Sequence, residues 1–235
     1  MEEKKEKILV LFSGGLDSTS VLYWAKANYK KVFAIIIDYR QKHHVETRMA
    51  IETATRLNVR YKQIDFSLKG IALSALIDEK EEIPDSLESS KNSEGIPFTY
   101  VPFRNGIFLS LAAAYAESHG IRDIATGFNL IDTPDYPDTT TAFASKMEAA
   151  INEGTSASLS GKKFRILSPL ISKTKAEIIQ FGLEHGADYA YAVSCYRGEE
   201  MPCGQCPSCD IRSSAFKELK LEDPLITRLR NQQSR

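Results

Sequence analysis

The sequence predicts an α/β fold in which a doubly wound, parallel sheet of five strands carries helices on both faces. Short apolar runs rich in β-branched residues alternate with helical patterns along most of the chain, and such alternation indicates parallel strands joined by right-handed crossovers. Polar segments that contain glycine or aspartate follow several of these runs. Because ligands bind beyond the carboxyl ends of parallel strands, these segments are expected to meet in one cleft.

The first predicted strand, at about 8–12, ends in Ser13-Gly14-Gly15, and Asp17-Ser18-Thr19 opens a helix over about 17–28. This arrangement favours phosphate binding, because glycines let successive N–H groups point at one anion and the helix dipole adds to the field. The lysine of a Walker loop, G-x-x-x-x-G-K-[ST], does not follow. We therefore expect the loop to hold pyrophosphate and not to transfer a γ-phosphoryl group.

Apolar runs at 32–37 and 59–64 predict the next two strands, with a helix over about 43–57 between them. A polar stretch at 78–95, flanked by prolines, predicts an excursion over the surface. The small apolar residues of 105–119, closed by Gly120, predict a buried helix.

Strands are predicted at about 123–126 and 165–167, with a helix over about 141–152 between them. Thr174 and Glu177 form a capping box that opens a further helix, which Gly186 closes. We expect a nucleotide-binding α/β domain over 1–190 and a helical, zinc-binding C-terminal segment over 191–235.

Composition limits the possible functions. Of the 235 residues, 43% are hydrophobic and 26% charged, and the formal net charge of −1 gives no general attraction to nucleic acid or anionic membranes. No apolar run approaches the ~20 residues of a membrane span. The N-terminal MEEKKEK lacks the apolar stretch of a secretion signal. A cytoplasmic location is expected, in which thiols stay reduced.

Four cysteines, Cys195, Cys203, Cys206 and Cys209, form the pattern C-x7-C-x2-C-x2-C. Two-residue spacings let successive thiolates turn onto one ion, and four thiolates complete a tetrahedron. One structural zinc ion per chain is the first interpretation. An iron–sulfur cluster is the alternative, because it also uses C-x2-C-x2-C spacing.

The loop sequence SGGLDS resembles the PP-loop of the adenine-nucleotide ATP pyrophosphatases, and its combination with CGQCPSC resembles the QueC family. The resemblance runs nearly end to end through FSGGLDST, DYRQKH, TYVPFRN, TGFN, YPD and SKTKAEI. It implies an adenine nucleotide alpha hydrolase-like fold and a role in queuosine biosynthesis. The implied activity is ATP-dependent conversion of 7-carboxy-7-deazaguanine and ammonia into 7-cyano-7-deazaguanine (preQ0) through an amide, with release of AMP and pyrophosphate.

The resemblance also implies the site residues. Ser13, Asp17 and Lys175 are expected to be catalytic. Asp17 would cap the helix or help to hold the Mg²⁺ that accompanies ATP. Lys173 and Lys175 would add positive charge from the opposite wall, unless they are solvated lysines at a helix start. The full set expected to bind the nucleotide is Phe12, Ser13, Gly14, Gly15, Leu16, Asp17, Ser18, Thr19, Asp38, Gly127 and Lys173.

Substrate binding is expected from residues that follow other strands. Arg104 and Asn105 would contact either phosphate or the base, although Asn105 would equally well cap a helix. The segment TPDYPDT would recognise the guanine-like ring or simply form a turn bounded by prolines. The full set is Gln41, His43, Arg104, Asn105, Asp132, Tyr136 and Asp138.

The chain departs from the QueC pattern in two places. Phe103 stands where P-G-R-N has glycine, which predicts a changed pocket volume, and Thr139-Thr140 replace the Cys-Arg that usually follows YPD. The expected partners are ATP, the deazaguanine carboxylate and ammonia, in a homodimer without nucleic acid or membrane. The alternatives are a QueC-like paralogue that joins a carboxylate to a different amine, including one on a protein, a PP-loop tRNA-thiolating enzyme, and a non-enzymatic zinc-ribbon module.

Overall fold

The structure is a computed structural model, and it describes residues 4–40, 44–78, 83, 91–131, 135–198 and 201–233. Its centre is one five-stranded sheet with the order β3-β2-β1-β4-β5. Every neighbouring pair is parallel, so the predicted sheet is confirmed. The strands are β1 (Lys5–Leu11), β2 (Tyr29–Asp38), β3 (Arg60–Asp65), β4 (Asp123–Ala125) and β5 (Arg165–Leu167).

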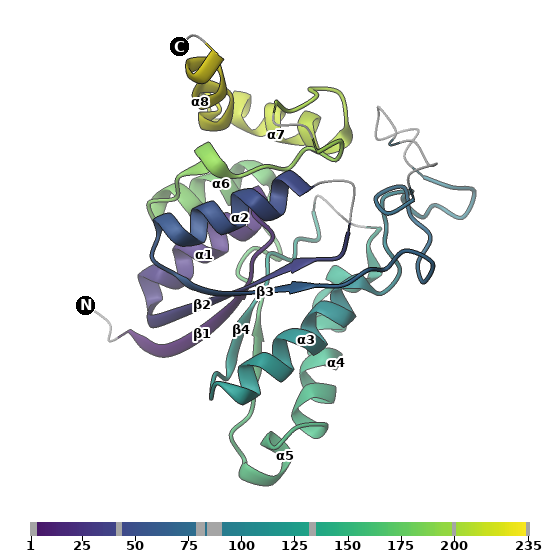
Figure 1. Ribbon diagram of the computed structural model, residues 1–235, viewed down its shortest axis with the longest axis vertical. Coiled ribbons are helices and arrows are strands. Elements are labelled where there is room, and N and C mark those ends of the chain that lie inside the picture. The colour runs from purple at the N-terminus through teal and green to yellow at the C-terminus, as the bar shows by residue number, and fades with distance from the viewer. Residues whose placement is uncertain are drawn as a thin grey trace.

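Helices cover both faces of the sheet (Figure 1). The chain moves to the second face after β3, so the sheet is doubly wound as predicted. One face carries α1 (Leu16–Asn28), α2 (His44–Arg56) and α6 (Lys175–Glu184), and the other carries α3 (Arg104–Ser118), α4 (Thr141–Glu153) and the short α5 (Ala157–Ser160).

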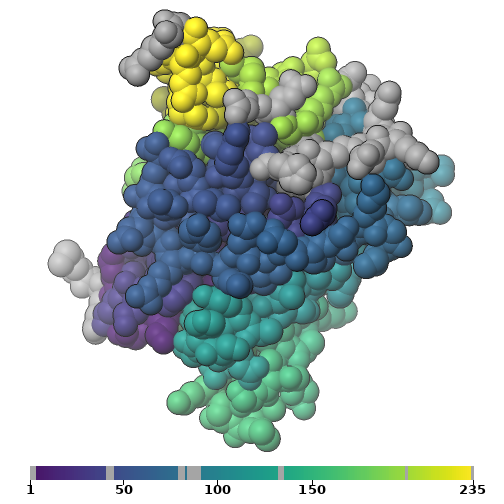
Figure 2. All heavy atoms as spheres, in the orientation of Figure 1, coloured from purple at the N-terminus to yellow at the C-terminus, as the bar shows by residue number. Residues whose placement is uncertain are grey.

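The C-terminal helices, α7 (Pro207–Glu218) and α8 (Pro224–Gln233), form a further layer outside α2 and α6. In Figure 2 these yellow-green and yellow residues make up one end of the molecule. Two single turns of 3₁₀ helix, η1 (Pro137–Thr139) and η2 (Tyr189–Tyr191), complete the elements. Among the described residues, no helix is both long and apolar enough to cross a bilayer.

The central strand β1 explains why its sequence is a continuous apolar run. Successive side chains of a strand point to opposite faces, so Ile8 and Val10 pack in the cluster beneath α1 and α6, whereas Leu9 packs in the cluster beneath α3. All three are fully buried. Burying each such side chain contributes roughly 1.5–3 kcal/mol, so the strand anchors both layers.

The local signals gave most boundaries correctly, and the capping box is confirmed. Thr174 Oγ1 accepts a hydrogen bond from the Glu177 N–H at 3.2 Å, and Glu177 Oε2 accepts one from the Thr174 N–H at 2.8 Å. Strand β2 begins earlier than predicted. Its first residue, Tyr29, is buried and its hydroxyl donates to Asp123 Oδ2 at 2.8 Å, which ties it to β4. Most of the predicted surface excursion at 78–95 lies outside the described residues.

The start of α3 differs from the prediction. Phe103, not Asn105, is the residue that precedes the helix, and it adopts the left-handed conformation with φ 55°. Its ring lies over Gly106, where an added Cβ would be 2.4 Å from a ring carbon. A side chain in this conformation costs roughly 1–2 kcal/mol that glycine avoids, which explains why glycine suits this position.

Replacing Phe103 tests this strain. Phe103→Gly and Phe103→Ala both remove the ring, but only glycine relaxes the backbone. We expect Phe103→Gly to have a free energy of unfolding about 1 kcal/mol higher than that of Phe103→Ala, measured by urea denaturation. Equal values for the two variants would contradict a left-handed residue at this position.

Candidate functional site

The loop after β1 is packed so closely at Gly14 that a side chain would not fit there. Gly14 has φ 87°, and a Cβ added to it would lie 2.6 Å from the Glu46 carbonyl oxygen and 2.9 Å from the Ala50 nitrogen of α2. On its other side, the Val193 N–H donates to the Gly14 carbonyl at 3.0 Å. The loop is therefore held between α2 and the segment that leads to the cysteines.

The amino end of α1 is arranged as an anion site. Gly15 precedes the helix and provides no side-chain cap, and the first N–H groups of a helix have no partner within it. Hydroxyls lie beside them: Ser13 Oγ accepts from the Gly15 N–H at 3.2 Å and is 3.1 Å from Ser18 Oγ. The predicted cap by Asp17 is wrong, because this carboxylate bonds elsewhere.

Asp17 instead pairs with a lysine of α6. Lys175 Nζ lies 2.6 Å and 2.8 Å from the two carboxylate oxygens, and the pair is largely buried, with exposed side-chain fractions of 15% for lysine and 27% for aspartate. The interpretation of Lys175 as a solvated lysine is therefore wrong. Lys173 differs, since its Nζ is 5.3 Å from the centroid of the Phe181 ring.

One cavity of about 320 Å³ opens beyond the carboxyl ends of β1, β2 and β4. It is lined by residues of the loop, of α3 and of the C-terminal segment, and its size is in the range of small-molecule sites. The predicted site residues that line it are Phe12, Ser13, Gly15, Leu16, Asp17, Ser18, Arg104, Asn105, Gly127, Tyr136 and Lys175.

Several predicted residues are placed elsewhere. Thr19 is fully buried, and Asp38 accepts a hydrogen bond from the Arg40 N–H at 2.8 Å. The predicted residues absent from the cavity wall are Gly14, Thr19, Asp38, Asp138 and Lys173. Gln41, His43 and Asp132 lie outside the described residues.

Arg104 places a partly buried cation at the cavity. Its Nη1 donates to the Tyr39 hydroxyl at 2.9 Å, and its guanidinium carbon is 5.6 Å and 5.8 Å from the ring centroids of Tyr39 and Phe108. Burial alone would lower the pKa of Arg104, but Tyr39 and Asp138 more than compensate and raise the pKa above its ordinary value. Arg104 is thus a permanent positive charge.

Asn105 and Asp138 hold the wall together. The Asn105 backbone N–H donates to Asp138 Oδ2 at 3.0 Å and its side-chain amide to the Asp138 carbonyl at 3.1 Å. The adjacent Tyr136 hydroxyl lies 2.5 Å from Thr99 Oγ1. Burial raises the pKa of Tyr136, as it does those of Tyr39 and Tyr196, so these cavity tyrosines keep their phenol protons.

The two departures from the QueC pattern have different consequences. Phe103 is 54% exposed and does not line the cavity, so the predicted change in pocket volume is wrong. Thr140 caps α4 by accepting from the Phe143 N–H at 3.0 Å. Only Thr139 faces the cavity.

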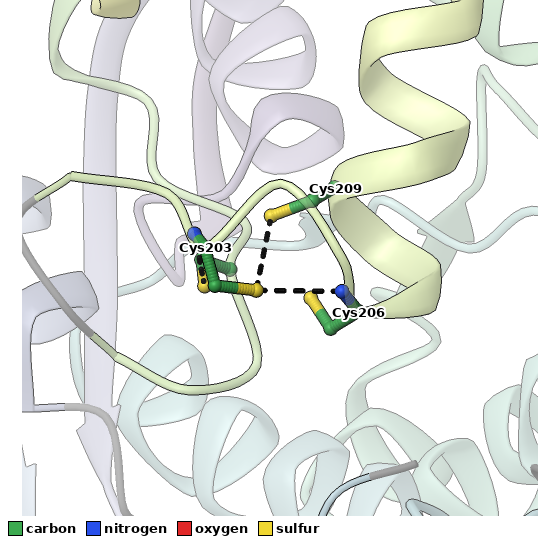
Figure 3. A group of neighbouring side chains, drawn as sticks. Cys203, Cys206 and Cys209 are labelled. Carbon is green, nitrogen blue, oxygen red and sulfur yellow. Dashed lines mark hydrogen bonds between the residues drawn. The ribbon is translucent and has the colours of Figure 1, made fainter. Parts of the chain in front are cut away.

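The four cysteines form a cluster that could hold a metal ion. Their sulfur atoms lie within 4.8 Å of one another, and four sulfurs bound at ~2.3 Å to one zinc ion would be about 3.8 Å apart. Figure 3 shows the Cys203 and Cys209 sulfurs, 4.0 Å apart, and the Cys206 N–H, which donates to Cys203 Sγ at 3.3 Å. Hydrogen bonds from the Cys206 and Cys209 thiols lower the pKa of Cys195, and the same contacts raise the pKa of Cys206 and Cys209.

Arg212 links α7, the helix that contains Cys209, to the cavity wall. The residue is 3% exposed; it pairs with Asp223 through Nε at 2.6 Å and Nη2 at 2.8 Å, and its Nη1 donates to the Ala192 carbonyl at 2.6 Å. The metal-binding segment thereby contributes to the cavity wall. Its lining residues are Ser194, Tyr196, Ser208, Ile211 and Arg212.

Sequence reasoning missed several cavity residues. Tyr39 and Asn129 come two and three positions after the ends of predicted strands, and Ser194 and Ser208 each precede a cysteine. Their position next to recognised features was the available signal. Thr99 opens the TYVPFRN motif, but Glu46 and Thr47 gave no signal, because only the tertiary fold brings them to the cavity.

Comparisons with known proteins agree with this geometry. The family model described as queuosine biosynthesis protein QueC matches residues 7–220. A 7-cyano-7-deazaguanine synthase from Pseudomonas aeruginosa is 42% identical over 223 residues, which cover 94% of this chain and 97% of the relative. One from Stutzerimonas stutzeri is 42% identical over 227 residues, 95% and 98% of the two chains.

A solved structure shares the fold. The NMN synthetase from Francisella tularensis superposes with a TM-score of 0.51 at 13% identity, over 93% of this chain and 79% of that chain.

Removing one sulfur tests the metal centre. Because metal binding to such sites contributes on the order of 10 kcal/mol to folding, Cys206→Ser is expected to lose bound metal and most of its soluble yield. Elemental analysis and the amount of protein in the soluble fraction measure both effects. Full metal content in Cys206→Ser would contradict a four-cysteine site.

Proposed function

Because this chain belongs to the QueC family, we propose that it converts 7-carboxy-7-deazaguanine and ammonia into 7-cyano-7-deazaguanine, with ATP as the activating co-substrate. The chain is an enzyme, as its relatives are synthases of that product. The finer assignment, an AMP-forming carbon–nitrogen ligase, is supported by the loop after β1, which lacks the lysine used in γ-phosphoryl transfer.

One observation carries the proposal. A single cavity joins the amino end of α1 to the partly buried Arg104 and to Tyr136. An enzyme that joins a carboxylate to the α-phosphate of ATP needs both reactants in one water-poor space, since alignment of reacting groups supplies a large part of the rate. The cavity provides that arrangement.

The proposed chemistry is two activations in sequence. A carboxylate is a poor electrophile, so its oxygen first attacks the α-phosphorus of ATP, which forms an acyl-adenylate and releases pyrophosphate. Ammonia then attacks the acyl carbon, and AMP leaves as the amide forms. The amide oxygen attacks a second ATP with loss of pyrophosphate, and departure of AMP and the amide protons leaves the nitrile.

The anion site at α1 would hold the departing pyrophosphate. The helix N–H groups with Ser13 and Ser18 would donate to its oxygens, and Lys175 would add positive charge. The Asp17 carboxylate would contact Mg²⁺, an ion that would offset phosphate charge. Its present pairing with Lys175 would keep both side chains oriented before ATP arrives.

Arg104 and Tyr136 would bind the second substrate. A permanent cation next to two aromatic rings suits an anionic group, here the carboxylate or the phosphate that it attacks. The Tyr136 ring would contact the flat deazaguanine. Asn105 and Asp138 would act by holding this wall in place.

We propose zinc as the metal and the 191–235 segment as its carrier, beside a nucleotide-binding part over 1–190. Four sulfurs within 4.8 Å of one another suit a single ion, whereas the thiolates of an iron–sulfur cluster bind different irons. With four protein ligands the ion would keep no open position, so its role would be structural. A homodimer in the cytoplasm stays a prediction from the sequence.

The direct test is a product assay. Purified chain with ATP, Mg²⁺, ammonia and 7-carboxy-7-deazaguanine is expected to yield the nitrile, with AMP and pyrophosphate as nucleotide products, identified by mass spectrometry and chromatography. Formation of ADP and phosphate would contradict the proposed activation. A carboxylate joined to another amine, with no nitrile, would identify the paralogue instead.

The phosphate site is tested by substitution. Ser13→Ala and Asp17→Ala are expected to lower AMP formation by roughly 10²-fold or more, because Ser13 would donate to the reacting phosphates and Asp17 would contact the Mg²⁺ that offsets their charge. Metal content, measured in the same preparations, should stay at the unsubstituted level. Near-normal AMP release from either variant would show that its assignment is wrong.

A further inference from the structure

Ser194 carries a hydroxyl that nothing in the described structure uses. Its Oγ is buried and has no hydrogen-bond partner among the described residues, although the residue lines the cavity. Leaving a buried hydroxyl unpaired costs roughly 1–3 kcal/mol. An unpaired hydroxyl at the wall of a binding cavity is explained if a ligand atom forms the missing hydrogen bond.

The backbone places Ser194 directly beside the phosphate-binding loop. The preceding residue, Val193, donates its N–H to the Gly14 carbonyl at 3.0 Å, and its own carbonyl oxygen would be 3.6 Å from a Cβ on Gly15. The Ser13 and Ser18 hydroxyls line the same cavity. The three serines therefore line one cavity from two segments far apart in the sequence.

The segment that carries Ser194 is held on three sides. Gly14 bonds Val193, Arg212 bonds the Ala192 carbonyl at 2.6 Å, and Cys195 belongs to the metal centre. A side chain on such a fixed backbone is preorganised for a ligand. This rigidity distinguishes Ser194 from a surface serine.

We propose that Ser194 is a further phosphate-binding residue, whose hydroxyl donates a hydrogen bond to the outer two phosphates of ATP and to the pyrophosphate that leaves. The inference rests on the proposed use of ATP. Pyrophosphate oxygens accept hydrogen bonds, and serine supplies the donor. The C-terminal segment thus contributes to nucleotide binding as well as to metal binding.

Direct binding measurements test this inference without the carboxylate. Ser194→Ala is expected to bind pyrophosphate and Mg²⁺-ATP about tenfold more weakly, the loss of one hydrogen bond to a charged group, in isothermal titration calorimetry. AMP, which lacks the outer phosphates, should bind unchanged. Ser194→Thr keeps the hydroxyl and should retain tight binding. Ser213→Ala, on the exposed side of α7, is the matched control.

Stability separates a binding role from a structural one. Removal of an unpaired buried hydroxyl should leave the ligand-free Ser194→Ala at least as stable as the unsubstituted chain, with full metal content. Unchanged pyrophosphate binding by Ser194→Ala, or an equal loss for AMP, would overturn the inference. Failure of the unsubstituted chain to make the nitrile, with these binding differences intact, would refute the proposed function alone.

Discussion

The close packing of the loop after β1 is the constraint on which the site depends. Gly14 touches the backbone of α2 on one side and bonds Val193 on the other, so any side chain there would separate these elements. That contact sets the amino end of α1 against the segment that leads to the cysteines. The cavity exists because three parts of the chain, distant in sequence, meet across a residue without a Cβ.

The sequence was sufficient to predict the structural features that depend on local chemistry. The apolar run of β1 reports burial on both faces, and the reciprocal bonds of Thr174 and Glu177 need only three residues of separation. The pairing of Asp17 with Lys175 spans 158 positions, and no local rule predicts it. The sequence indicated both residues, therefore, but could not show that each is the partner of the other.

The start of α3 shows how a sound local rule fails. Asn105 is a favoured capping residue, yet the backbone N–H and amide of Asn105 are both committed to Asp138. This long-range contact draws Asn105 inside the helix and leaves Phe103 in the left-handed turn. The departure from glycine at 103 is thus a matter of backbone strain on the surface, and Phe103 does not line the cavity.

The four-cysteine cluster belongs to the same arrangement. A metal that only stabilised the C-terminal segment would not affect the cavity. Here, however, residues next to the cysteines line the cavity, and Arg212 joins α7 to Ala192. Two ligands that each stabilise one shared segment favour each other's binding, by thermodynamic necessity and to the same extent. A metal bound by the cysteines and a nucleotide bound in the cavity would therefore be coupled through residues 192–196, so we expect loss of the metal to weaken nucleotide binding before any reacting group is changed.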